Sequence, residues 1–378
     1  MKIAINCIYY TPKGGGITEY IHNLIKELTK LNHHHNFIIY VNREAEKQMN
    51  DIVGGNARIK TFPFLEAQKY KRSLFQQRYW TGQEKTEKFD LFHSPFFHAP
   101  KFKHARVVLT VHDLRFLNYP LSYKLLRLIY LLFEVKRSIK KAEHIIAISQ
   151  FTKNEIVKHY HVDGSKIEVI HEAVDAEGFK ISNNLSTLTI SNTRIERNKY
   201  ILAVGHIEPR KNYLNLIKAY SKLPSSIREN YRLIIVGKKN HNYKKVLDAI
   251  KSTEDIHYLN FITREELTWL YANCKIHAFP SFYEGFGFPS LEAGLFGKPT
   301  VGANQSSIPE VAGKGSLYFN PFSTDEIKQS LQKLLGDDKL YNKIANNAAE
   351  NVKQFSWEEN AKKTLRIYNQ IEKCLKEK

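Results

Sequence analysis

The chain has 378 residues, of which 42% are hydrophobic and 25% are charged, and its formal net charge is +19. This length accommodates two domains of ordinary size, and the composition is that of a globular protein in water. The cysteines Cys7, Cys274 and Cys374 lie far apart in the sequence. Their spacing excludes a disulfide framework and a zinc site built from paired cysteines.

The first ten residues alternate like a strand and do not resemble a signal peptide. The most apolar run, residues 125–135, is too short to span a bilayer. We therefore expect a cytoplasmic protein. Its positive charge suits a polyanion, an anionic lipid surface or a phosphate-bearing substrate, and charge alone does not choose among them.

Short apolar runs alternate with amphipathic helical patterns along the chain. In the first part, strands are predicted over residues 2–8, 37–41, 106–112, 144–149 and 166–171, and helices over 18–31, 122–141 and from 150. After a polar stretch rich in serine and asparagine, strands are predicted over 200–205, 231–237, 257–262 and 275–280. Such apolar strands indicate parallel sheets covered on both faces.

The alternation predicts two doubly wound α/β domains, residues 1–178 and 199–356, joined by a linker at about 179–198. The C-terminal part is helical in pattern, and its last helix, at about 357–378, is a candidate to pack back onto the first domain. Ligands of open α/β sheets bind beyond the carboxyl ends of the strands. The glycines and charged residues that follow the predicted strands are therefore the candidate site residues.

The stretch "YEGFGFPSLEAG", residues 283–294, follows one such strand. Pro289 suits the start of a helix, whose free amides bind phosphate or carboxylate groups. The glycines let the backbone approach a bulky ligand, and Glu284 and Glu292 could accept hydrogen bonds from sugar hydroxyls. An ordinary strand–loop–helix turn, with Glu292 favourable to the helix dipole, remains the alternative.

Two further loops have a composition that suits phosphate. In "EPRKN", residues 208–212, Arg210 and Lys211 could hold a diphosphate, or could be solvated surface residues. The glycine run "PKGGGITEY", residues 12–20, faces a helix start, with a tight turn as the alternative. It matches neither the dinucleotide fingerprint nor the P-loop.

His112 ends a buried strand in "LTVHDLRF" and could face a ligand or serve as a satisfied structural histidine. The run His33–His35 lies where a turn is expected, so we interpret it as a solvated loop and not as a metal cluster. No two aspartates are separated by a single residue in the sequence, so the usual metal-holding pair of metal-dependent sugar-nucleotide transferases is missing.

In combination, "VGHIEPRKN", "FPSFYEGFGFPSLEAGLFGKPTVGANQSSIPEVAG" and "FSWEENAKKTLRIY" resemble glycosyltransferase family 4, whose fold is GT-B. The seven residues between Glu284 and Glu292 match the signature of that family. The resemblance is strong over residues 200–368. In the first domain the resemblance is weaker, and the glycine run, "VHD" and "ISQFTK" are similar in residue type to the stretches of the family.

The resemblance implies two Rossmann-like domains that face each other across a cleft, the first binding the acceptor and the second a nucleotide-sugar. It implies that Glu284 contacts the transferred sugar, Glu292 the ribose, and the loop between them the diphosphate and sugar. Arg210 and Lys211 match the phosphate-binding basic pair. The remaining implied donor-binding residues are Gly15, Gly16, Gly205, Gly285, Phe286, Gly287 and Phe288.

His112 matches the histidine that the family places against the sugar. One departure concerns the basic pair, because many members have arginine where this chain has His206. The form "EPRKN" suggests that Arg210 takes over, which leaves the basic partner of Lys211 open. The resemblance implies transfer with retention of configuration and no cofactor or metal.

We expect a mannose donor, GDP-mannose, with a UDP-hexose as the second choice, and a glycan or lipid-linked glycan acceptor in cell-envelope polysaccharide synthesis, as in lipopolysaccharide. A nucleotide-sugar epimerase or hydrolase of the same fold is the alternative, and a nucleic-acid-binding protein is a remote one suggested by charge alone. Product formation in the absence of acceptor would reveal the epimerase or hydrolase, and binding that falls steeply with salt would reveal the nucleic-acid-binding protein.

Residues 122–141, "SYKLLRLIYLLFEVKRSIKK", combine six basic residues with one acid. Leu125, Ile129, Leu132, Val135 and Ile139 recur at helical spacing and are most simply the core face of a domain helix. A basic helix with surplus apolar residues is also typical of a membrane interface. The sequence therefore raises peripheral binding to the inner face of an anionic membrane as a further hypothesis.

Overall fold

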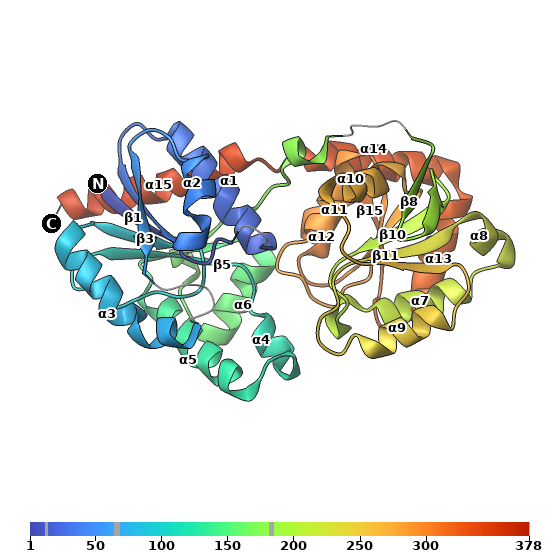
Figure 1. The fold of residues 1–378 in the computed structure, drawn as a ribbon, viewed down its shortest axis with the longest axis horizontal. Helices are drawn as coiled ribbons and strands as arrows, with labels where there is room; N and C mark the ends of the chain where they lie inside the picture. Colours follow the sequence, from blue (N-terminus) through green and yellow to red (C-terminus); the bar gives the residue numbers. More distant parts are fainter. Residues whose placement is uncertain (12–13, 64–68, 181–184, 378) are drawn as a thin grey trace. The chain divides into compact units, whose positions relative to one another are not determined.

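The computed structural model describes residues 1–11, 14–63, 69–180 and 185–377. It divides into two compact units, the first formed by Met1–Glu172 with Ser356–Lys378 and the second by Ala173–Phe355. Each unit has a parallel sheet with helices on both faces (Figure 1). The predicted doubly wound α/β architecture is thus confirmed in both units.

In the first unit, the sheet order is β3-β2-β1-β4-β5-β6-β7, and neighbouring strands are parallel. Its strands are β1 (Lys2–Cys7), β2 (Asn36–Asn42), β3 (Ala57–Phe62), β4 (Leu91–Ser94), β5 (Arg106–Val111), β6 (His144–Ala147) and β7 (Ile167–Val169). Its helices are α1 (Gly16–Leu31), α2 (Glu46–Asn50), α3 (Lys69–Glu87), α4 (Arg115–Asn118), α5 (Leu125–Lys141), α6 (Gln150–Tyr160) and α15 (Trp357–Lys376).

In the second unit, the parallel sheet has the order β12-β11-β10-β13-β14-β15. Its strands are β10 (Tyr200–Val204), β11 (Arg232–Val236), β12 (Ile256–Leu259), β13 (Ile276–Phe279), β14 (Thr300–Ala303) and β15 (Ser316–Phe319). Its helices are α7 (Tyr213–Ser221), α8 (Ser225–Asn230), α9 (Lys244–Lys251), α10 (Arg264–Asn273), α11 (Phe288–Leu295), α12 (Ile308–Ala312), α13 (Thr324–Gly336) and α14 (Asp338–Val352).

Alternating strand residues explain why helices cover both faces of the second sheet. Ile201 and Ala203 of β10 pack with the buried residues of α7, α9 and α13. Tyr200 and Leu202, which point to the opposite face, pack with α10 and α11. Successive side chains of a strand point to opposite faces, so a strand buried on both sides must be apolar throughout.

The segment predicted as a linker, 179–198, is not simply a connection. It contains an antiparallel hairpin of β8 (Thr187–Ile190) and β9 (Thr193–Glu196), which belongs to the second unit. The turn residues Ser191 and Asn192 both have positive φ, as a two-residue hairpin turn of type I′ requires. Ile190 and Ile195 are buried in the core of that unit. The serine and asparagine content had suggested a loop, but alternating apolar residues give the hairpin one buried face.

Helix α15 returns to the first unit after the chain has completed the second. It packs along α1, and its Tyr368 hydroxyl lies 2.5 Å from Nδ1 of the buried His93. On its exposed side, Glu372 lies 2.9 Å from Nε2 of His34. His35 is buried and its Nε2 lies 2.9 Å from Oδ1 of Asn369. The histidine run is therefore not a wholly solvated loop as predicted, because His35 is buried against α15 while His33 and His34 are exposed.

His34, His35 and Glu372 offer ligand atoms within 4.8 Å of one another, which is a spacing that a metal ion could use. The Glu372 carboxylate already has two cationic neighbours, the Lys376 ammonium at 3.2 Å and the amino group of Met1 at 3.4 Å. These contacts explain the cluster as packing between α15 and the start of β2. Within the described residues, no helix combines the length and the apolar character needed to cross a membrane.

Candidate active site

The second sheet reverses its strand order at β10, which lies between β11 and β13. Loops that leave the carboxyl ends of two neighbouring strands at such a point enclose the usual ligand site of an open α/β sheet. Here these are the loop of residues 205–212 after β10 and the loop of residues 280–287 after β13. The backbone amide of Phe282 donates to the carbonyl of Arg210 at 2.9 Å, which joins the two loops.

Side chains from these loops form a buried ion cluster of Glu208, Arg210, Lys211 and Glu284. The Glu284 carboxylate lies 2.7 Å from Nζ of Lys211 through one oxygen and 2.7 Å from Arg210 through the other. Residues 73 positions apart are thus joined because β10 and β13 are neighbours in the sheet. Three of the four predicted catalytic residues meet here.

Glu208 is the member of the ion cluster that the sequence interpretation did not single out. Its Oε1 accepts from Nε and Nη2 of Arg210 at 2.9 and 2.7 Å, and its other oxygen accepts from Asn240 at 2.8 Å. Arg210 also donates to the carbonyl of Tyr283. The guanidinium is therefore held between both carboxylates, and its geometry suits positioning Glu284 more directly than binding a diphosphate.

Burial and pairing set the charges of the ion cluster. Burial raises the pKa of Glu284, but Arg210 and Lys211 outweigh it and bring that pKa to about 2. Burial lowers the pKa of Lys211 below its ordinary value, although the Glu284 carboxylate opposes the change. For Arg210, burial also acts to lower the pKa, yet Glu284 and Glu208 leave it above its ordinary value. The carboxylate of Glu284 is thus ionised at neutral pH beside a partly desolvated ammonium.

Gly205 directly follows β10 and leaves room for the Lys211 side chain. A Cβ atom at this position would lie 2.9 Å from Cε of Lys211 and 3.0 Å from the Tyr213 hydroxyl. The backbone φ of Gly205 is +149°, which side-chain-bearing residues rarely adopt. The glycine is therefore required by the lysine that it faces. The Tyr213 hydroxyl also donates to the Gly205 carbonyl at 3.0 Å.

The loop from Glu284 to Phe288 is held by two serines that the sequence interpretation missed. Ser306 Oγ accepts from the Glu284 amide at 2.9 Å, and Ser307 Oγ donates to the Glu284 carbonyl at 2.9 Å. Gly287, with φ of +133°, precedes α11, and no side chain caps this helix start. The "SS" pair in residues 306–307 was the available sequence signal.

Gly285 and Phe286 complete this loop, and Phe286 is buried with its ring against those of Phe288 and Phe355. Glu292 lies one turn into α11 and is not a member of the ion cluster. The Tyr271 hydroxyl of α10 donates to Glu292 at 2.5 Å. Burial and this carboxylate raise the pKa of Tyr271 well above its ordinary value, so the hydroxyl keeps its proton and orients Glu292.

The other predicted site residues belong to the first unit. Gly15 and Gly16 are exposed at the start of α1, where Gly15 is the N-cap. His112 directly follows β5, with Nδ1 3.0 Å from Glu172 and Nε2 3.0 Å from the carbonyl of Pro95. Both neighbours are acceptors, so both nitrogens can donate when the ring is protonated.

The protonation of His112 bears on its predicted role. Burial acts to lower the pKa of His112, but the hydrogen bond and charge of Glu172 more than offset this and raise it. The edge of the Tyr20 ring packs against the imidazole at 4.7 Å between centroids. Glu172 and the Pro95 carbonyl hold both ring nitrogens in place, and the contact of His112 with the sugar stays a prediction.

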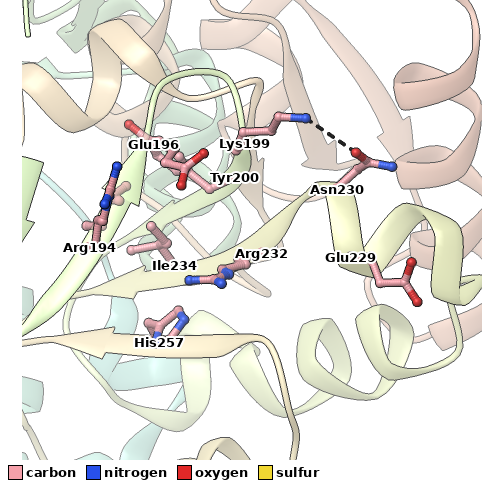
Figure 2. A pocket seen from close by; sticks show the side chains of 10 residues that line it. Arg194, Glu196, Lys199, Tyr200, Glu229, Asn230, Arg232, Ile234 and His257 are labelled. Carbon is pink, nitrogen blue, oxygen red and sulfur yellow. Dashed lines mark hydrogen bonds between the residues drawn. The ribbon is translucent and has the colours of Figure 1, made fainter. Parts of the chain in front are cut away.

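A separate hollow of about 280 Å³ lies at the amino ends of the strands of the second sheet, opposite to the ion cluster (Figure 2). Its lining comes from the amino ends of the strands, including Tyr200, Arg232 and His257, and from Arg194 of the hairpin. Because ligands of this sheet class bind at the carboxyl ends, we do not assign the donor to this hollow.

Two family models match the chain, one for each half. The model described as glycosyl transferases group 1 matches residues 188–351, and that described as glycosyltransferase family 4 matches residues 14–177. An O-antigen chain mannosyltransferase B from Escherichia coli is 30% identical over 281 residues, which are 74% of each chain. A serotype-specific mannosyltransferase WbdA from the same species is 31% identical over 58% of this chain and 28% of that longer protein.

Among solved structures, sucrose-phosphate synthase from Thermosynechococcus elongatus is similar with a TM-score of 0.77 and 15% sequence identity. The similarity covers 99% of this chain and 100% of that one. Together with the two sheets, it defines the GT-B fold of a glycosyltransferase. The chain belongs to glycosyltransferase family 4, the group 1 glycosyltransferases, as its sequence motifs had indicated.

Proposed function

We propose that the chain is a retaining hexosyltransferase that transfers mannose from GDP-mannose to a glycan or lipid-linked glycan in cell-envelope polysaccharide synthesis. The observation that carries this proposal is the buried ion cluster at the switch point of the second sheet. The mannosyltransferases of Escherichia coli to which the chain is similar support mannose and an envelope glycan. A UDP-hexose is the second choice of donor.

In this proposal the ion cluster serves the leaving diphosphate. Negative charge grows on that group as the bond from the anomeric carbon to the phosphate oxygen breaks, so cations placed beside it lower the barrier. Lys211 is the candidate ligand because its ammonium is a buried point charge, 2.7 Å from Glu284 and above the ring of Phe279. Arg210 is assigned to positioning, since its nitrogens are engaged by Glu208, Tyr283 and Glu284.

Glu284 and the start of α11 are assigned to the sugar and the phosphates. The Glu284 carboxylate would accept hydrogen bonds from sugar hydroxyls once the diphosphate takes its place beside Lys211. The uncapped start of α11, at Gly287, places positive partial charge near the phosphates. Glu292, oriented by Tyr271, would accept from the ribose.

Retention follows in the proposal when the acceptor attacks from the face that the diphosphate leaves. The acceptor oxygen bonds to the anomeric carbon as the phosphate oxygen departs, and the acceptor proton passes to that phosphate oxygen. No protein base is required, because the departing phosphate oxygen takes the acceptor proton. No metal is required, because lysine and helix amides supply the positive charge. His112, Gly15 and Gly16 of the first unit stay predicted ligand-binding residues.

A thermal-stability assay with a panel of nucleotide-sugars tests the donor. A ligand at about 100 times its dissociation constant stabilises the folded state by roughly 2.7 kcal/mol. We expect GDP-mannose to raise the melting temperature more than UDP-glucose does. Equal shifts with both, or no shift with either, would contradict the assignment of a GDP-linked donor.

Incubation of the protein with GDP-mannose and a synthetic alkyl mannoside tests the reaction. The expected product is a disaccharide with retained anomeric configuration, formed also in the presence of EDTA. Activity lost in EDTA and restored by magnesium or manganese would refute the metal-independent part. Release of free mannose, or of a second nucleotide-sugar, at the same rate without acceptor would favour a hydrolase or an epimerase instead.

A further inference from the structure

Helix α5 of the first unit, labelled in Figure 1, and the turn before it carry several large apolar side chains that are exposed. The exposed fractions are 95% for Leu121, 70% for Leu125, 82% for Leu126, 54% for Ile129 and 69% for Phe133. Scattered exposed apolar residues need no explanation, but a contiguous group marks an interaction surface. These five residues, here called the α5 patch, are Leu121, in the turn four residues before the helix begins, and four helix residues that recur at spacings of three and four.

The exposure is not the result of a loosely packed helix. The opposite face of α5 is anchored by buried Val135 and Ile139, and Ser138 accepts from the Ala99 amide at 2.9 Å. The predicted core stripe was right for these two apolar residues and wrong for Leu125, Ile129 and Leu132, which are exposed. The helix is rotated about its axis from the predicted orientation. The apolar side chains of its first turns therefore face outward.

Basic residues surround the α5 patch. Lys136, Lys140 and Lys141 are exposed on the later turns of the helix, and Lys124 and Arg127 are exposed beside its first turn. The one acidic residue of α5, Glu134, is buried and pairs with His98 and Arg137. That pairing keeps the pKa of Glu134 at about 2, despite the opposing effect of burial. No acid of α5 therefore reaches the exposed side.

We propose that the α5 patch is a docking surface for an anionic lipid interface, with the helix axis lying in the plane of the membrane. An apolar face flanked by lysine and arginine is the pattern that inserts into the boundary between headgroups and acyl chains. A second copy of the chain is the less suitable occupant. A symmetric contact would bring the two sets of basic residues together without an acid on α5 to pair with them.

This inference rests on the proposed function only where it places a lipid-linked acceptor at the same interface. Binding itself requires neither donor nor acceptor. A test with vesicles can therefore fail while glycosyl transfer to a soluble acceptor stands, and transfer can fail while vesicle binding stands.

Vesicle flotation with the full chain tests the proposal. One set of vesicles contains phosphatidylcholine alone, and a second contains phosphatidylcholine with phosphatidylglycerol. We expect the protein to float with the anionic vesicles at low salt. Each lysine near an anionic leaflet contributes roughly fivefold in binding, so floating protein should decrease as salt screens these charges.

Two double variants separate the charged and apolar contributions. Lys136→Glu with Lys140→Glu should weaken binding to the anionic vesicles by at least about tenfold. Leu126→Gln with Phe133→Gln should weaken binding to a similar degree, by about tenfold, because the insertion of two large side chains is lost. Arg137 is left unchanged, since it pairs with the buried Glu134 and its loss would disturb the fold.

The matched control is Lys333→Glu with Lys339→Glu, which changes the net charge equally at exposed positions of the second unit. It should float as the unchanged protein does, and all variants should keep their melting temperature. Equal recovery of unbound protein with both vesicle types at low salt would overturn the proposal. So would equal weakening by the control, or a dimer in sedimentation that Leu126→Gln with Phe133→Gln dissociates.

Discussion

The two units share an architecture but present their candidate site residues differently. In the second unit, Arg210, Lys211 and Glu284 are already in contact, buried and paired. In the first unit, Gly15 and Gly16 are exposed, and the first unit's His112 is satisfied by protein acceptors. The second unit thus holds a preorganised group of charges, whereas the first offers a glycine-rich loop and one oriented ring.

This difference indicates how the two units divide the work in the proposed reaction. Preorganised charges suit a ligand whose chemistry is fixed, such as a diphosphate, because they need not rearrange as charge develops. The described part of the exposed glycine loop in the first unit contributes no buried charge, and helix α5 is proposed to bind lipid. Changes in the ion cluster of the second unit should therefore affect transfer most, and changes outside that cluster should have smaller effects.

The largest effect is expected from Lys211→Ala in the second unit. Removing one electrostatic donor to a developing negative charge typically costs about 100-fold or more in rate. Arg210 remains beside Glu284 in this variant, so the carboxylate keeps a partner and the fold should persist. Steady-state transfer and circular dichroism measure the two quantities.

Lys222→Ala is the matched control for that experiment. Lys222 is an exposed lysine of the same unit and pairs with Asp325 at 3.0 Å. Exposed pairs contribute about 0–1 kcal/mol to stability, so transfer should be unchanged. Transfer by Lys211→Ala at a rate close to that of the control would remove Lys211 from the proposed site.

A smaller effect is expected in the first unit from Glu172→Gln. The pKa of His112 is raised above its ordinary value of about 6.5, so the His112–Glu172 pair stabilises the fold fully below that pH. The contribution is lost as the pH rises through the raised pKa. Loss of a hydrogen bond between charged groups costs about 1.5–3 kcal/mol.

Thermal unfolding as a function of pH measures this effect. The melting temperature of Glu172→Gln should lie furthest below that of the unchanged protein under mildly acidic conditions, and the gap should narrow toward alkaline pH. A gap that is constant with pH, or that widens as the pH rises, would show that His112 is not held as a cation.

The smallest effect is expected from Tyr271→Phe, which removes the hydroxyl that donates to Glu292. The carboxylate stays in place and loses one orienting contact, so the change should stay below about tenfold, or 1.4 kcal/mol. If Glu292 binds the ribose, KM for the nucleotide-sugar should rise while kcat is kept. A fall in kcat with unchanged KM would place Glu292 in the chemical step instead.

Much of the fold follows from sequence because its strands are nearly continuous apolar runs between helical patterns. The strands at residues 2–8 and 200–205, for example, appear as β1 and β10. The strand β4 was missed, since Leu91–Ser94 is short and contains two polar residues, although it lies beside β1 in the sheet. The hairpin of β8 and β9 was missed because its polar face resembles a loop.

The candidate site was predictable as a set of residues and not as a network. The motifs indicated Arg210, Lys211 and Glu284. That these residues contact one another depends on β10 and β13 being adjacent strands, and the sequence did not reveal this strand order. For the same reason Glu208 was not recognised, since an acid beside a basic pair is ordinary on a surface. Burial turns it into the partner of Arg210.

The central claim is that the second unit keeps its phosphate-binding cation paired with Glu284 until a diphosphate replaces the carboxylate. Glu284→Gln keeps the shape of the side chain and removes its charge, which leaves the ion cluster with a surplus positive charge. Titration calorimetry with GDP and with UDP, on the unchanged protein, Glu284→Gln and Lys211→Ala, measures the consequence directly.

We expect Glu284→Gln to bind its nucleoside diphosphate more tightly, by roughly fivefold or more for about 1 kcal/mol of relieved competition, while transfer falls by about 100-fold or more. Lys211→Ala should weaken the same binding. The account would be contradicted if Glu284→Gln and Lys211→Ala both bound GDP and UDP as the unchanged protein does, or if Glu284→Gln lost affinity together with Lys211→Ala.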